Sequence, residues 1–144
     1  MSTILNTLAT GLTVFSQPMV IVYMAVGVLF GMYGGAMPGI SATMAISLMV
    51  SFTYNWEMGP ALGMIIGCYV GAVYGGSRSA ILLNVPGTPS ALATTFDGYP
   101  LAMKGKAAKA LGVTAIQSVI GGIIGSIFLI VAAPLITNFA LMFA

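Results

Sequence analysis

The sequence predicts an all-α membrane protein: a polytopic helical bundle with about four transmembrane spans and one or two re-entrant or broken helices. Hydrophobic residues make up 59% of the chain, charged residues make up 4%, and the mean hydropathy is +1.09. A soluble domain carries about 25% charged residues because its surface faces water. We therefore expect residues 1–144 to form one transmembrane domain in a lipid bilayer, where each span needs roughly 20 apolar residues.

The charged residues also limit the classes of function. Residues 1–56 and 110–144 contain no charge at all. The net charge is +2, which is too small to suggest binding of nucleic acid. The chain has one cysteine and no histidine, so we expect no metal centre and no cofactor. The two acidic residues lie far apart and no serine has an evident base, so the sequence does not predict an enzyme.

The apolar runs and their interruptions predict the order of the helices. Pro18 suits the first turn of a helix, where its missing N–H removes no hydrogen bond. Trp56 and Glu57 mark a membrane boundary, because tryptophan is enriched at the headgroup level. The expected helices are a short one at 2–16, which lies at the interface or leads into the first span, and spans at 18–37, 58–76 and 107–136. A short run at 42–53 is expected to be half of a broken helix.

Residues 77–96 carry too much polarity for a helix that faces lipid. Irregular backbone at membrane depth occurs only where it is buried in protein or lines a wet cavity. We therefore expect a re-entrant hairpin at Ile81–Thr95, with Asn84–Pro89 at its tip. The residues Asp97-Gly98-Tyr99-Pro100 that follow are typical of a turn.

Three lysines predict the orientation of the bundle. Loops rich in lysine and arginine stay on the cytoplasmic side, so we place the Lys104–Lys109 loop in the cytoplasm. The span 58–76 then runs inward and 107–136 runs outward. The direction of the N-terminal helices stays open, because the run at 42–53 is short for a full crossing.

Glycines recur every four residues in three of the expected helices. Small residues at this spacing let helix backbones approach closely in lipid. They predict a tightly packed bundle, and they do not indicate which substrate the protein transports. The glycines concerned are Gly27, Gly31 and Gly35, then Gly59, Gly63, Gly67, Gly71 and Gly75, and finally Gly121 and Gly125.

Two segments, Gly34–Ser41 and Gly75–Ser90, share one pattern. In each, a helix ends in a double glycine, a Pro-Gly step breaks the chain, and hydroxyl residues begin a new apolar run. Pairs of interrupted apolar segments indicate the substrate site of a membrane transporter. The free N–H groups at the start of each new helix, together with the helix dipole, attract an anion.

The expected backbone donors lie at Ile40–Thr43 and at Thr88–Ala91. Such a site would hold an anion without a fixed positive charge, which would be costly inside a membrane. The alternative is that each Pro-Gly step is a kink that binds nothing. The candidate substrate-binding residues are Pro38, Gly39, Ser41, Thr43, Asn84, Pro86, Gly87, Thr88 and Ser90.

Several of these segments resemble the signature of the large membrane subunit of the tripartite tricarboxylate transporters. The similarity runs from about residue 20 to the end, and its most specific part is the long motif Ala80–Pro89. The segments that carry it are Tyr74–Ser77, Ala80–Pro89, Asp97–Pro100, Lys104–Ala107 and Ala110-Leu111, together with the earlier break at Gly34–Ser41.

The resemblance implies a membrane subunit for ion-gradient-driven uptake (symport) of tricarboxylates or related organic anions, such as dicarboxylates, across the bacterial inner membrane. It implies two protein partners, a small membrane subunit and a periplasmic solute-binding protein. The family's large subunit has about twelve spans in two similar halves, so we expect this chain to be the N-terminal half. It would need the missing C-terminal half, or a second copy, to complete a translocation path.

Two charged residues have alternative roles. Asp97 is a candidate for binding the coupling ion, and equally an acidic residue that caps a turn. Arg78 could pair with a substrate carboxylate, or extend to the cytoplasmic surface.

Two other functions are compatible with the sequence. In a channel or pore subunit, the hairpin would line a conduction path and the protein would carry currents rather than saturable uptake. A non-transporting scaffold would assemble through its glycines and would tolerate substitution of Asn84 or Thr88.

Overall fold

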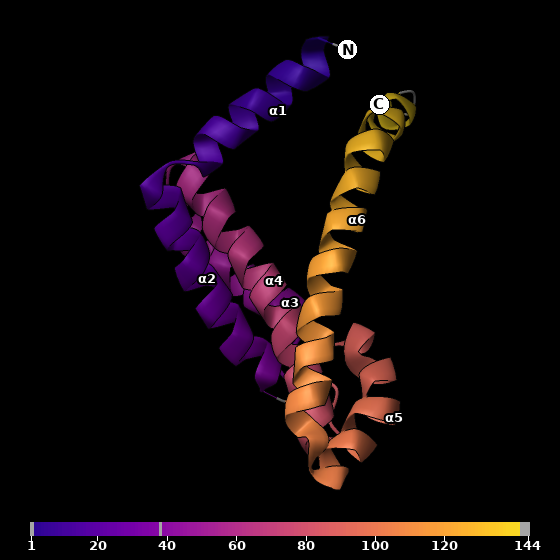
Figure 1. The fold of residues 1–144 in the computed structure, drawn as a ribbon. Coiled ribbons are helices and arrows are strands. Elements are labelled where there is room, and N and C mark those ends of the chain that lie inside the picture. Colours follow the sequence, from indigo (N-terminus) through magenta and orange to yellow (C-terminus); the bar gives the residue numbers. More distant parts are fainter. Residues whose placement is uncertain (1, 38, 142–144) are drawn as a thin grey trace. The chain divides into compact units, whose positions relative to one another are not determined.

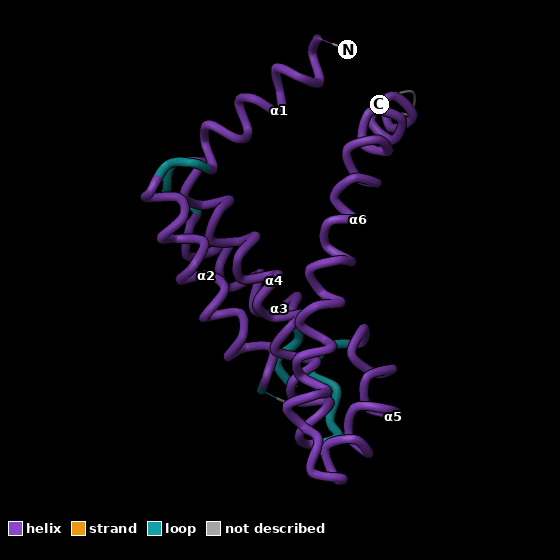
Figure 2. Tube along the Cα trace, in the orientation of Figure 1, coloured by secondary structure: helices purple, strands orange, loops and turns teal. Residues whose placement is uncertain are grey.

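The computed structural model describes residues 2–37 and 39–141, and these residues form helices joined by short loops (Figures 1 and 2). All-α architecture is therefore confirmed for this part of the chain. The helices in order are α1 (Ser2–Phe15), α2 (Pro18–Ala36), α3 (Ala42–Thr53), α4 (Met58–Leu83), the 3-10 turn η1 (Pro89–Ala91), α5 (Leu92–Leu101), the π-helical turn η2 (Ala102–Lys106) and α6 (Ala107–Leu141).

Local sequence explains the starts of α2 and α3 and the end of α4. Pro18 occupies the first turn of α2, as predicted. The hydroxyl of Ser41 accepts a hydrogen bond from the backbone N–H of Met44 (3.3 Å) and so caps α3. Asn84 ends α4 in the left-handed conformation (φ 59°), which asparagine tolerates better than most residues.

The α2 and α4 helices make the most extensive contact in the fold, and they run parallel. Glycines of each helix lie directly on backbone carbonyl groups of the other: Gly27, Gly31 and Gly35 on Met64, Cys68 and Ala72, and Gly67, Gly71 and Gly75 on Met24, Val28 and Met32. Residue numbers rise together along both helices, which establishes the parallel direction. A Cβ atom at any of these glycines would approach the opposite backbone closer than 3.0 Å.

The shorter α3 helix returns the chain between these two parallel helices. Near its start, Ala45 lies beside Gly34 at the end of α2. Just after the end of α3, the ring centre of Trp56 lies 4.8 Å from the ring centre of Tyr23, near the start of α2. Helix α3 is therefore antiparallel to α2.

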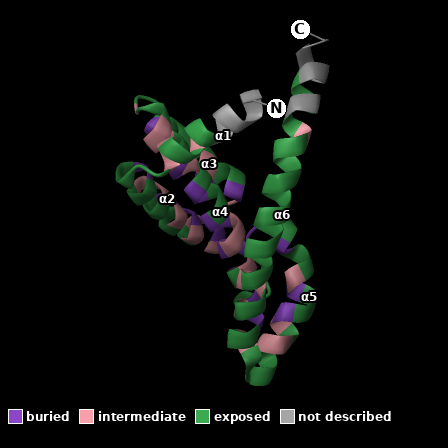
Figure 3. Ribbon diagram, turned by 45° about the horizontal axis from the view of Figure 1, so that its top comes forward, coloured by how far each residue is buried: buried purple, intermediate pink, exposed green. Residues whose placement is uncertain are grey.

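The buried residues lie mainly where α2, α3 and α4 meet (Figure 3). Ala45 and Met49 of α3 pack on Met64 and Cys68 of α4, and Cys68 is completely buried. The glycines thus bring the backbones of α2 and α4 together, and small and flexible apolar side chains fill the space beside α3.

Two sequence predictions need correction after residue 76. The span expected at 58–76 continues as α4 to Leu83, so the first residues of the expected hairpin are helical. The turn predicted at Asp97-Gly98-Tyr99-Pro100 is wrong, because these residues belong to α5. Gly98 fits the helix because it packs on Ile81, and Pro100 is followed by the π-helical turn η2. The residue with turn conformation is Gly105 (φ 75°), between two lysines.

The packing divides the chain into two units, and the second begins at Gly112 within α6. In this second unit, large apolar side chains such as Ile116, Ile120 and Phe128 are exposed on all sides of the helix. A helix that is apolar all round belongs in lipid or inside a larger protein. The expectation of a single domain over residues 1–144 stays a prediction.

Three stretches of the described residues are long and apolar enough to cross a membrane. They are Pro18–Ala36, Met58–Leu83 and one within Pro89–Ala133, and α3 adds a shorter apolar helix. Together these elements make a helical membrane bundle with about the number of spans that the sequence predicts.

The α2–α4 packing predicts a large effect of a single methyl group. Gly71→Ala places a Cβ against the backbone of Val28 and Met32, which no rotamer change can relieve. We expect a loss of at least about 2 kcal/mol of stability, measured as thermal unfolding in detergent. Gly112→Ala is the control, since its Cβ would meet nothing within 4 Å. Equal stability of the two variants would contradict this packing.

Candidate functional site

The first Pro-Gly break joins α2 to α3. Pro38, one of the predicted site residues, lies outside the described residues. Gly39 is exposed with φ 97°, a backbone conformation that favours glycine. The N–H of Ile40 donates to the carbonyl of Met37 (3.2 Å), so this predicted donor is already used. The first turn of α3, which begins at Ala42, supplies the remaining donors.

Two hydroxyl groups accompany the start of α3. The Ser41 and Thr43 oxygens are 2.6 Å apart and share a hydrogen bond. Ser41 is half-buried and Thr43 is exposed. The predicted pair is thus brought together at a helix N-terminus, with one hydroxyl accessible from outside the bundle.

The second Pro-Gly break turns the chain back along α4. Gly87 donates its N–H to the carbonyl of Gly76 (3.4 Å), although Gly76 lies two turns before the end of α4. By the helical rise of 1.5 Å per residue, the chain therefore retreats roughly 10 Å from Leu83. It then advances again as α5, where Gly98 packs on Ile81. Asn84 and Gly87 thus lie in a short reversal rather than in a straight continuation of α4.

Gly87 is the most confined residue of this reversal. A Cβ atom on it would clash with the carbonyl oxygen of Gly35, the Cα of Gly76 and the hydroxyl of Ser79. Pro86 beside it is half-buried, whereas Asn84 is exposed. Gly87 therefore packs the reversal against both α2 and α4, and the amide of Asn84 lies outside this packing.

A second hydroxyl pair follows Gly87. The oxygens of Thr88 and Ser90 lie 3.1 Å apart. Thr88 is 4% exposed and packs against Gly76, whereas Ser90 is exposed. Residues Pro89–Ala91 then form the turn η1 that leads into α5, so this pair also stands at a helical N-terminus. Two of the four donors predicted at Thr88–Ala91 are not available, because Pro89 has no N–H and the N–H of Ala91 donates to the carbonyl of Thr88 (3.0 Å).

The two breaks meet at the C-terminal end of α2. Gly34 lies beside Ile40 and Ala45 of the first break and of α3, and its neighbour Gly35 contacts Gly87 of the second break. Two segments that are almost fifty residues apart in the sequence thus adjoin the same double glycine. Each presents an exposed hydroxyl, on Thr43 and on Ser90, at the start of a helix.

Sequence reasoning missed the residues that support this arrangement. Gly35 and Gly76 receive Gly87, and the buried hydroxyl of Ser79 donates to the carbonyl of Gly76 (3.0 Å). The double glycines were visible as a pattern, but only the fold shows that they form the seat for the second break. Ser79 carried no distinguishing signal in the sequence.

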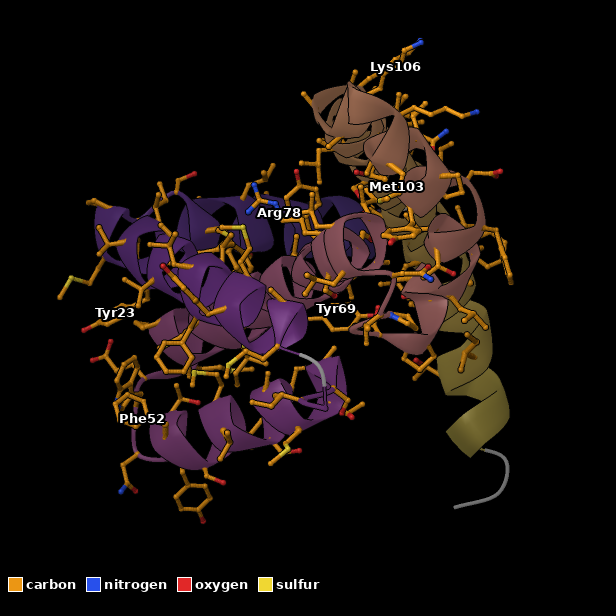
Figure 4. All side chains as sticks on the ribbon, turned by 90° about the horizontal axis from the view of Figure 1, so that it is seen from below. Tyr23, Phe52, Tyr69, Arg78, Met103 and Lys106 are labelled. Carbon is orange, nitrogen blue, oxygen red and sulfur yellow. The ribbon has the colours of Figure 1, made fainter. Side chains whose placement is uncertain are left out.

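The charged residues from the second half of α4 onward differ in what they contact. Asp97 is exposed within α5, so its predicted alternative role as a turn cap is wrong. The guanidinium of Arg78 lies 5.2 Å from the ring centre of Tyr74 and contacts the sulfur of Met32 (3.8 Å). Lys104 and Lys106 are exposed on η2, beyond the end of α5, and Figure 4 shows Lys106 pointing away from the bundle.

The confinement of Gly87 can be tested by chemical labelling. In a Cys68→Ala background, we expect a cysteine placed by Thr88→Cys to resist a water-soluble maleimide, because Thr88 is buried. Adding Gly87→Ala should displace the reversal and raise the labelling rate at least about tenfold, since a clash with backbone forces the chain to move.

Ser90→Cys serves as the control, because Ser90 is exposed and should react at a similar rate with and without Gly87→Ala. Fast labelling at Thr88→Cys before Gly87 is changed would show that the second break is not seated as described.

Comparison with known proteins places the chain in a family. A family model described as the tripartite tricarboxylate transporter TctA family matches residues 21–144. Over 143 residues the chain is 38% identical to an Agrobacterium vitis protein described as an uncharacterized 52.8 kDa protein in the TAR-I ttuC' 3' region. That match covers 99% of this chain and 28% of the relative. No solved structure matches the chain. The chain therefore belongs to the tripartite tricarboxylate transporter TctA family.

Proposed function

We propose that this chain forms part of the membrane subunit of a secondary transporter that takes up tricarboxylates or related organic anions. One observation carries the proposal: two Pro-Gly breaks, each followed by a hydroxyl pair at a helical N-terminus, adjoin the same end of α2. Backbone N–H groups and helix dipoles at such ends attract carboxylates. Family membership supports the same class of transport.

The geometry divides the candidate residues into two roles. Thr43, Asn84 and Ser90 are exposed and are the groups that we expect to contact the anion. Gly87 and the buried Thr88 hold the second break against α2 and α4, so we expect them to position the site. An anion bound in this way needs no lysine or arginine beside it, which suits a membrane interior.

The direction of α2 and α4 extends the topology proposal. If the Lys104–Lys109 loop is cytoplasmic, then α4 runs inward, and the parallel α2 does the same. Both breaks then lie at the cytoplasmic ends of their helices in the bacterial inner membrane. The aromatic cluster of Tyr23, Phe52 and Trp56 lies at the opposite ends, as expected of an aromatic belt.

We further propose that uptake depends on a periplasmic solute-binding protein, a small membrane subunit and an ion gradient. The chain spans 28% of the length of its relative from A. vitis, so a complete path would use the remainder of the membrane subunit. Asp97, which is exposed on α5, is the candidate for the coupling ion, because it is the acidic residue nearest to the second break.

An uptake assay tests this function. The complete membrane subunit would be combined with the small subunit and the binding protein in membrane vesicles, and radiolabelled citrate and related acids followed over time. Ser90→Ala and Asn84→Gly should each lower uptake about tenfold, because a hydrogen bond to a charged ligand contributes about 1.5–3 kcal/mol. Glycine at position 84 removes the amide while allowing φ 59°.

Ser51→Ala is the matched control. Its exposed hydroxyl donates to the backbone carbonyl of Ser47, near the C-terminal end of α3 and away from both breaks. Normal saturable uptake by both site variants, at normal abundance in the membrane, would refute the anion site. Currents without saturable uptake would favour a channel instead.

A further inference from the structure

The contacts between α2 and α4 have a two-fold symmetry that the sequence alone does not reveal. Adding 40 to a residue number in α2 gives its counterpart in α4, as in Gly27 and Gly67. Gly27 lies on Met64, and Gly67 lies on Met24, which is the counterpart of Met64. The same exchange holds for the two following pairs of glycines. The helices are therefore related by a pseudo-two-fold axis parallel to them, as in the parallel repeats of some transporters.

This symmetry breaks down where α3 packs. On the side covered by α3, Met64, Ile65 and Cys68 of α4 pack in the core, with Met64 5% and Cys68 0% exposed. Their counterparts Met24, Ala25 and Val28 on α2 are not buried, and Ala25 is exposed. One of two equivalent faces is thus filled by a helix, and within the first unit, Met1–Leu111, the other is uncovered. We call the uncovered one the open face, and it consists of Ala25, Val28, Met32, Val70, Tyr74 and Arg78.

Arg78 gives the open face a charge that the covered face lacks. Its contacts in the described part of the chain are the sulfur of Met32 and the ring of Tyr74, and neither group carries a negative charge. Figure 4 shows Arg78 on the other side of the helix pair from Phe52 of α3. An arginine beside apolar residues of two spanning helices favours a carboxylate partner, which matches its planar pair of donors.

We propose that the open face binds a transmembrane helix from the remainder of the membrane subunit. The helix is apolar, runs antiparallel to α2 and α4 as α3 does, and carries a carboxylate at the level of Arg78. The relative from A. vitis has ample length for it, because the region shared with this chain is 28% of that protein. This proposal does not depend on which anion the protein transports, or on whether the breaks bind one.

Two other occupants fit the open face less well. A second copy bound through the same face about a two-fold axis would bring Arg78 close to its own equivalent, and like charges repel across an interface. Lipid chains supply no partner for Arg78, and headgroup phosphates are available only at the membrane surface. Small residues such as Ala25 typically mark places where a helix approaches closely.

Photo-crosslinking in the complete membrane subunit tests the proposal. Val70→p-benzoylphenylalanine places the probe on the open face, and its counterpart Phe30 shows that an aromatic side chain fits at the equivalent position. After irradiation in native membranes, we expect a cross-linked peptide from an apolar segment of the same subunit outside this chain. The matched control is Val26→p-benzoylphenylalanine, since Val26 is also exposed but lies outside the open face; it should give no such peptide.

Charge reversal adds a second measurement on the same probe. Arg78→Glu should lower the yield of the Val70 cross-link about tenfold or more, because like charges across an interface cost several kcal/mol. Cross-links from Val70 to lipid alone, to a second copy, or to a different protein would overturn the proposal. An unchanged yield after Arg78→Glu would overturn the role of the carboxylate. The cross-linking yield does not depend on citrate uptake, so the cross-linking experiment and the transport assay can fail separately.

Discussion

The close contact of two helix backbones at interlocking glycines is the constraint on which the rest of the structure depends. Hydrophobic burial does not hold helices together in lipid, so van der Waals packing must do so. Here three glycines of α2 (Gly27, Gly31 and Gly35) and three of α4 (Gly67, Gly71 and Gly75) lie on carbonyl groups of the other helix, and this fixes both register and direction. The parallel direction requires a return segment, which is α3. It also brings the ends of both helices, where the two breaks lie, to the same level of the bundle.

The second break depends on the same constraint. Gly87 can pack against Gly35 and Gly76 because Gly87 has no side chain and because α2 and α4 are close together at that level. The buried hydroxyls of Ser79 and Thr88 are hydrogen-bonded within the contact, so polarity inside the bundle is satisfied locally. The hydroxyl of Ser90 and the amide of Asn84 remain exposed. Packing of backbone atoms thus determines which polar groups can meet a ligand.

Much of this organisation could be predicted from the sequence, for physical reasons that differ between elements. The bounds of α2 and α3 are clear because Pro18 and Ser41 act locally at helix starts. The end of α4 differs from the prediction because residues 77–96 were expected to be too polar for a helix that faces lipid. Ser77 and Ser79 instead lie within α4, with their hydroxyls bonded back to its carbonyl groups. The prediction of a turn at Asp97–Pro100 was wrong, because the packing of Gly98 on Ile81 outweighs the local preference of these residues for a turn. The meeting of the two breaks depends on long-range packing, which no local pattern encodes.

The parallel pairing of α2 and α4 is the central claim, and a distance measurement in lipid vesicles tests it most directly. Spin labels would be placed by Met19→Cys with Met58→Cys, and by Met19→Cys with Leu82→Cys, in a Cys68→Ala background; all three labelled positions are exposed. Parallel helices place Met19 and Met58 at the same level, about one helix spacing of 8–10 Å apart before the label arms are added. Leu82 should lie more than roughly 30 Å away, given a rise of 1.5 Å per residue. A long distance to Met58 with a short one to Leu82 would mean antiparallel helices, and would contradict the arrangement of both breaks.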